Sequence, residues 1–193
     1  MDLVGAIAQS PWLYAVVFVL VVADAFIVVL PSETVVVALG SLAMSTGSPN
    51  VWMLIPVAAL GAIVGDNLCY FIGRRIGTER FGWMRRPRIQ AAIGHARTAL
   101  HKRPASLILT ARYIPFARIA ANLTAGATLF PYRRYLPLTI VAGSGWAVYN
   151  CVIGALLGAW LSSYPVLAVA ISVVVAIGLG ILIDTLAARF ARR

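Results

Sequence analysis

Five long apolar segments dominate the sequence, and they constrain its fold more than any other feature. A helix needs about 20 apolar residues to cross the hydrocarbon core of a bilayer. Hydrophobic residues make up 61% of the chain and charged residues 11%, too few to form the polar surface of a soluble domain. We therefore expect a single all-α, polytopic membrane domain over residues 1–193. The apolar segments are residues 11–46, 51–73, 105–130, 136–160 and 164–188.

The first and third apolar segments do not read as simple spans, because each contains a proline break and two charged residues. A charge at the bilayer centre costs about 2.5–3.5 kcal/mol. These charges are therefore expected to face one another, a cavity or water. Broken apolar segments at matching places in two halves are typical of inverted-repeat transporters. The breaks are Pro31-Ser32 and Pro115, and the charges are Asp24, Glu33, Arg112 and Arg118.

The basic residues indicate the topology. None of the sixteen precedes Arg74, and nine lie in the 74–104 loop. Basic loops beside apolar segments mark the cytoplasmic side and attract anionic lipids. We therefore place the 74–104 loop, the 131–134 turn and the C-terminus in the cytoplasm, and the 45–50 turn outside.

This topology predicts an inverted repeat. The 105–130 segment lies between two cytoplasmic regions, so it enters and returns as a re-entrant hairpin with its tip near Pro115. By symmetry, residues 11–46 form a hairpin from the opposite side with its tip near Pro31, although residues 11–30 are long enough to cross alone. Each hairpin is followed by one transmembrane helix, and 164–188 forms a further C-terminal one.

Other function classes lack their expected residues. The net charge of +10 is concentrated in loops beside apolar segments, which argues against nucleic-acid binding. Cys69 and Cys151 lie in apolar stretches and are read as buried hydrophobes, while His95 and His101 lie in the basic loop and are read as solvated. No hydrolase motif and no Cys/His metal cluster occurs, so neither an enzyme nor a cofactor or metal is expected. A removable signal peptide is not expected either.

Three short motifs contain most of the charged residues of the apolar segments. Small residues also recur every fourth residue along 61–77, as Gly at 61, 65, 73 and 77 and Cys at 69, and Gly recurs at 154 and 158, a spacing that lets helices pack closely in lipid. The motif residues, in chain order, are Asp24, Pro31, Ser32 and Glu33; Gly65, Asp66, Tyr70, Gly73 and Arg74; and Arg112, Pro115, Arg118 and Gly126.

In this order and at these separations, the motifs resemble the DedA family, the bacterial branch of the proteins with a VTT (SNARE-associated) domain. The resemblance covers about residues 10–160. Two positions depart from it: Asp24 stands where Glu is usual, and Phe116 where Gly is usual. The resemblance implies two inverted re-entrant hairpins in the bacterial plasma membrane. It also implies lipid translocation coupled to the proton motive force, with undecaprenyl phosphate among the proposed cargoes and phospholipids for eukaryotic relatives.

The same residues support this chemistry directly. Arginine presents a planar fork that suits phosphate, so Arg112 and Arg118 are expected to bind a lipid phosphate. Asp24 and Glu33 are expected to exchange protons, with sodium as the alternative ion. Ser32 is placed to cap a helix that begins at Glu33. The partners are therefore membrane lipids and protons; the oligomeric state, including a homo-oligomer, is left open.

Three alternatives remain at this stage. The acids and arginines can pair only as salt bridges in a structural or assembly protein. Asp66 can serve only to pair with Arg74 or Arg75, or to form a hydrogen bond at a packed Gly65. An intramembrane lipid-phosphate hydrolase is the third and the least supported.

Overall fold

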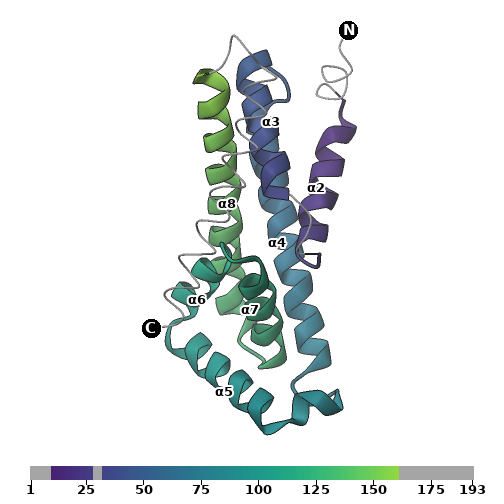
Figure 1. Ribbon diagram of the computed structural model, residues 1–193, viewed down its shortest axis with the longest axis vertical. Helices are drawn as coiled ribbons and strands as arrows, with labels where there is room; N and C mark the ends of the chain where they lie inside the picture. The colour runs from purple at the N-terminus through teal and green to yellow at the C-terminus, as the bar shows by residue number, and fades with distance from the viewer. Residues whose placement is uncertain (1–9, 28–31, 161–193) are drawn as a thin grey trace.

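The computed structural model describes residues 10–27 and 32–160, and all regular structure within them is helical, as predicted. Figure 1 shows an elongated bundle in which two long helices carry the shorter ones. The elements are α2 (Trp12–Asp24), α3 (Ser32–Thr46), α4 (Val51–Ile76), the short 3₁₀ helix η1 (Gly82–Arg85), α5 (Pro87–Lys102), α6 (Pro104–Ala111), α7 (Pro115–Ala127) and α8 (Tyr132–Trp160). Pro31 and the predicted helix 164–188 lie outside the described residues.

Among the described residues, two helices are long and apolar enough to cross a membrane. They are α4, with 26 residues, and α8, with 29. At about 1.5 Å per residue both exceed the roughly 30 Å of a hydrocarbon core. The predicted spans 51–73 and 136–160 are thus confirmed as long apolar helices.

The two broken segments form pairs of shorter helices. α2 and α3 have 13 and 15 residues, and α6 and α7 have 8 and 13. In Figure 1, α2 and α3 meet near the middle of the molecule from one end, and α6 and α7 meet there from the other. The break predicted near Pro115 occurs at residues 112–114, directly before α7.

Each half of the molecule packs partly against the long helix of the other half. The second helix of each short pair lies against the long helix of the opposite half, so α3 packs on α8 and α7 packs on α4. The first helix of each pair packs on the long helix of its own half, α2 on α4 and α6 on α8. The contacts of the first half are thus matched by equivalent contacts of the second. Each half buries its second short helix against the long helix of the other half.

The outward surfaces of the long helices are apolar, whereas some of their buried positions are polar. On α4, Leu60 and Phe71 are exposed while Asp66 is buried. On α8, Val141 and Leu156 are exposed while Asn150 is buried. Water would select the opposite pattern, so this distribution indicates that the bundle is surrounded by lipid.

The basic 74–104 region contains more helix than predicted. We expected a loop, but α4 continues to Ile76 and the 16-residue α5 follows. α5 is held by its inner face, where Leu100 is fully buried, and its other residues are largely exposed, His95 and His101 among them. Hydrophobic residues recur at helical spacing among the arginines of this region. The high charge of the region led us to expect a loop and to overlook this helical pattern.

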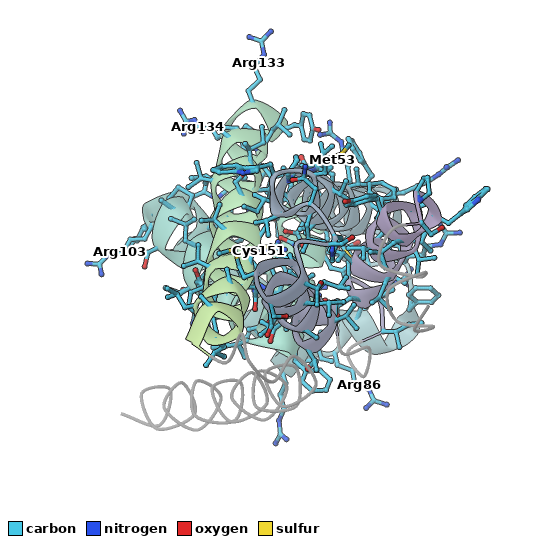
Figure 2. The ribbon with its side chains drawn as sticks, turned by 90° about the horizontal axis from the view of Figure 1, so that it is seen from above. Met53, Arg86, Arg103, Arg133, Arg134 and Cys151 are labelled. Carbon is cyan, nitrogen blue, oxygen red and sulfur yellow. The ribbon has the colours of Figure 1, made fainter. Side chains whose placement is uncertain are left out.

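Arginines of the two basic regions, 74–104 and 131–134, project away from the bundle. Figure 2 looks down on the molecule and shows Arg86, Arg103, Arg133 and Arg134 extending from its perimeter, with Cys151 among the helices. In Figure 1, α5 and the start of α8 lie at one end, opposite the turn between α3 and α4. The two basic regions therefore share an end, as the predicted topology requires.

Glycines allow a close approach of the helices where the two halves meet, at the α4–α7 and α3–α8 contacts. A Cβ added to Gly126 of α7 would collide with the carbonyl oxygen of Tyr70 on α4. A Cβ added to Gly154 of α8 would collide in the same way with the carbonyl oxygen of Val37 on α3. The two collisions are with backbone, which cannot move aside as a side chain can.

We expect Gly154→Ala to destabilise the protein by at least about 1–3 kcal/mol, the cost of overpacking a filled interior. Gly145→Ala is the matched control on the same helix, because a Cβ there meets nothing within 4 Å. That control should be neutral or stabilising, since alanine favours helix over glycine by about 1 kcal/mol. Thermal unfolding of the purified protein in detergent measures both, and equal melting temperatures would contradict the close α3–α8 contact.

Candidate functional site

A buried polar network lies where the two short helix pairs meet the long helices. Asp24 ends α2, Asp66 lies in the middle of α4, Arg112 follows α6 and Arg118 lies in the first turns of α7. All four residues are buried, with relative exposures between 3% and 8%. Along α4, Asp66 separates Ala62 of one apolar cluster from Tyr70 of the other, so the network divides the hydrophobic core.

Arg112 forms a buried ion pair with Asp66. Its Nη1 donates to Oδ2 of Asp66. Asn122 of α7 donates to the other carboxylate oxygen at 2.9 Å, and the Tyr135 hydroxyl donates to the Asp66 carbonyl oxygen at 2.9 Å. Both carboxylate oxygens thus have donors, which offsets the cost of burying the charge.

Arg118 forms the second buried pair, with Asp24. Its Nη2 donates to Oδ2 of Asp24 at 2.9 Å and to the Asp24 carbonyl oxygen at 2.7 Å. The carbonyl is accessible because it lies at the end of α2, where backbone oxygens lack helical partners. This contact joins the tip of one short helix pair to the tip of the other.

Several donors in the network have no acceptor. Within the described part of the chain, Nε and Nη2 of Arg112 and Nε of Arg118 are buried without a hydrogen-bond partner. The Ser32 hydroxyl is also buried and unpartnered there. Buried polar atoms are rarely left unsatisfied, because each costs about 1–3 kcal/mol or more when charged. These donors are therefore suited to an anionic ligand.

Glu33 belongs to the same network through Trp146 of α8. The indole Nε1 donates to Oε1 of Glu33 at 3.2 Å. The Arg112 guanidinium carbon lies 5.2 Å from the centre of the indole ring, which is within range of a cation–π interaction. Glu33 is half-buried and, unlike Asp24 and Asp66, its described donor is a neutral group.

Two sequence expectations at this site are wrong. Asp66 pairs with Arg112 and not with Arg74 or Arg75, because Asp66 faces α6 and α7 while Arg74 and Arg75 lie two turns further along α4. Ser32 does not precede its helix as a cap but is the first residue of α3, and its hydroxyl bonds to no described group.

The remaining motif residues hold α4 against α7 and α2. The Tyr70 hydroxyl donates to the Phe130 carbonyl oxygen at 2.6 Å and accepts from Arg74 Nη1 at 3.1 Å. A Cβ on Gly73 would collide with backbone of α7, and one on Gly65 would lie 2.7 Å from the Ala25 side chain. This motif therefore positions the helix that presents Asp66.

Sequence reasoning missed three residues of the network: Asn122, Tyr135 and Trp146. Asn122 lies one helical turn after Arg118, so the i, i+4 rule could have placed both on one face of α7. Trp146 and Tyr135 look like ordinary core aromatics in sequence, and only the tertiary contacts give their polar atoms a role.

The network contains two guanidinium groups and three carboxylates, those of Asp24, Glu33 and Asp66. Such a set can bind an anion and can exchange a proton. The described residues contain no group of three or more His, Cys, Asp or Glu side chains that could hold a metal ion.

Comparison with known proteins identifies the family of this chain. The VTT domain family matches residues 30–156, which include most of the network. Protein DedA of Escherichia coli strain K12 is 30% identical over 158 residues, covering 79% of this chain and 67% of that protein. An uncharacterized membrane protein of Mycobacterium leprae is 33% identical over 133 residues, 67% of this chain.

The chain spans only 58% of the length of that mycobacterial relative. No solved structure matches this chain. The family match covers well over half of the chain and includes Glu33, Asp66, Arg112, Arg118 and their packing residues. The chain is therefore a membrane protein of the VTT domain family, to which DedA belongs.

Proposed function

We propose that the protein is a membrane lipid transporter, a flippase or scramblase that moves a phosphate-bearing lipid such as undecaprenyl phosphate or a phospholipid. The observation that carries this proposal is the pair of buried arginines with unused donors. Arg112 and Arg118 are at most 7% exposed and together leave three N–H-bearing nitrogens without a described acceptor. A purely structural ion pair needs no spare donors inside a bilayer.

A lipid phosphate fits these donors. The phosphate oxygens can accept hydrogen bonds from the parallel N–H groups of a guanidinium, and arginine stays charged in an apolar setting. Arg112 and Arg118 lie close enough to repel one another electrostatically, so one anion between them would relieve that repulsion. The lipid tails would stay in the bilayer beside the apolar outer faces of α4 and α8.

Proton coupling is proposed at the carboxylates. Asp24 is already paired with Arg118, whereas the described donor to Glu33 is a neutral indole. Glu33 is therefore the carboxylate whose charge is least compensated, and a carboxylate inside a membrane protein without a cationic partner is suited to exchange a proton. Sodium is the alternative coupling ion.

The short helices are proposed to be re-entrant hairpins in a bacterial plasma membrane. At about 1.5 Å per residue, α2, α3, α6 and α7 are each roughly 12–22 Å long, shorter than the roughly 30 Å core. Each pair would thus enter and leave on the same side, and α5 with its arginines would lie in the cytoplasm.

A structural role is the second candidate, and the two buried ion pairs favour it. Asp66–Arg112 and Asp24–Arg118 could serve only to hold the helices together. An intramembrane hydrolase has no comparable support, and we propose a transporter and not an enzyme.

The orientation is tested by introducing a cysteine at Thr46, the last residue of α3, or at Thr98 of α5, both of which are exposed. Figure 1 shows the end of α3 and α5 at opposite ends of the bundle. The native Cys69 and Cys151 are buried. A membrane-impermeant maleimide added to intact cells should label position 46 only, and label position 98 after lysis. Labelling of both positions from the same side would refute the topology.

The phosphate role is tested with Arg118→Lys in proteoliposomes containing labelled phosphatidylglycerol or polyprenyl phosphate. Lysine keeps the charge beside Asp24 but loses the fork. We expect flipping to fall about tenfold or more, because hydrogen bonds to charged groups contribute about 1.5–3 kcal/mol. Arg118→Ala should be as inactive, but it also leaves Asp24 unpaired, at a cost of about 3–5 kcal/mol in stability.

The charge-swapped variant Asp24→Arg/Arg118→Asp separates this role from the structural one. It keeps a buried pair but moves the guanidinium from α7 to α2. We expect a folded, monodisperse protein that does not flip lipid. Restored flipping would show that the pair is only a salt bridge.

Proton coupling is tested with Glu33→Gln, which keeps the shape and the acceptor but cannot titrate. An imposed pH gradient should accelerate flipping by the wild type and leave the variant unchanged, and Asp24→Asn is the parallel variant. If both variants respond to the gradient as the wild type does, the acids are structural.

A further inference from the structure

We propose that Trp146 couples the protonation of Glu33 to the availability of Arg112 for phosphate. The inference rests on the proposed function and adds a positioning residue to it. Trp146 belongs to none of the three sequence motifs, so neither the motifs nor the family resemblance assigns it a role.

Trp146 is the one aromatic side chain among the described residues that contacts both an acid of the first half and an arginine of the second. It lies in the middle of α8 and is 1% exposed. Its Nε1 donates to Glu33 at the start of α3, and its ring lies 5.2 Å from the Arg112 guanidinium carbon. Asn150 donates to its carbonyl oxygen at 2.9 Å. The indole therefore connects the two halves at the centre of the bundle.

The contact with the indole ring explains how Arg112 can be buried while two of its nitrogens have no described hydrogen-bond acceptor. Nη1 of Arg112 bonds to Asp66, but Nε and Nη2 have no described acceptor. An aromatic face stabilises a cation through its quadrupole without accepting conventional hydrogen bonds. The indole thus stabilises the charge of Arg112 without using its remaining N–H groups, and these become accessible to phosphate oxygens when the ring moves away.

The hydrogen bond to Glu33 fixes where the indole lies. A bond from a neutral donor to a carboxylate is about twice as strong as one between neutral groups. Protonation of Glu33 converts the acceptor into a neutral carboxyl and weakens this bond, which frees the ring to leave Arg112. Phosphate binding at Arg112 displaces the ring in turn and favours the protonated Glu33. By linkage, the two effects are the same coupling free energy.

Other charged groups near Glu33 do not substitute for this connection. Asp66 and Asp24 are held by Arg112 and Arg118. Arg118 and Tyr149 act on Glu33 only through longer-range electrostatics, and Tyr149 stacks edge-on against Tyr113. Trp146 is the only described hydrogen-bond donor to the Glu33 side chain.

The first test is Trp146→Phe in proteoliposomes containing labelled phosphatidylglycerol. Phenylalanine keeps an aromatic face but has no N–H, so the link to Glu33 is lost. The readout is the ratio of flipping rates with and without a pH gradient, acid on the side from which lipid is taken up. Coupling free energies between sites typically correspond to about fivefold or more. We expect a ratio of that size for the wild type and about one for Trp146→Phe.

The matched control is Trp52→Phe at the start of α4, where the side chain is 84% exposed. It should keep the wild-type ratio. A wild-type ratio in Trp146→Phe would overturn the inference and leave the proposed function standing. Absence of any gradient response in the wild type would instead refute the proposed proton coupling.

The second test does not depend on transport or on the folding of Trp146→Phe. Phenylglyoxal modification of arginines is followed residue by residue by mass spectrometry in the purified protein. Glu33→Ala removes the acceptor of the indole, and Arg112 should then react severalfold faster than in the wild type. Arg133, which is exposed at the perimeter of the bundle, is the internal reference, and Arg118 should change less than Arg112. An unchanged Arg112 rate would overturn the inference.

Discussion

The need to compensate charges inside an apolar bundle determines how this chain folds. Asp24 and Arg118 are 94 residues apart in sequence, and Asp66 and Arg112 are 46 apart. A single charge at the centre of a bilayer costs about 2.5–3.5 kcal/mol, and removing one partner of a buried pair costs about 3–5 kcal/mol. The helices can therefore assemble only in an arrangement that brings these partners together, and this arrangement places the tips of the short helix pairs at the middle of the molecule.

The close helix contacts follow from the same requirement. The ion pairs form only if α7 approaches α4, and that approach requires Gly126 and Gly73 at the crossing. The equivalent contact of the other half, α3 on α8, is equally close at Gly154. Lipid provides little hydrophobic force between helices, so packing of this kind supplies much of the stability. Because each half packs on the long helix of the other, each short pair contacts both long helices.

The sequence predicted the parts of this structure that depend on local pattern and left out those that depend on tertiary contacts. The long helices α4 and α8 follow from apolar length, and the break before α7 follows from Pro115 in a charged apolar segment. The partner of Asp66 could not be predicted, because nearby Arg74 is close in sequence whereas Arg112 is close only after folding. Trp146 was missed for the same reason, since a tryptophan in an apolar helix shows nothing of its hydrogen bond to Glu33.

The balance of charges in the network determines the direction of the proposed coupling. With every group ionised, the carboxylates of Asp24, Asp66 and Glu33 outnumber the guanidiniums of Arg112 and Arg118 by one. A lipid phosphate would add at least one more negative charge to a site from which water is largely excluded, where Coulombic repulsion is strong. Asp24 and Asp66 are already paired with arginines, so the proposed mechanism assigns the compensating proton to Glu33. In that mechanism lipid binding and proton uptake occur together, and the lipid phosphate and the proton are proposed to cross in the same direction.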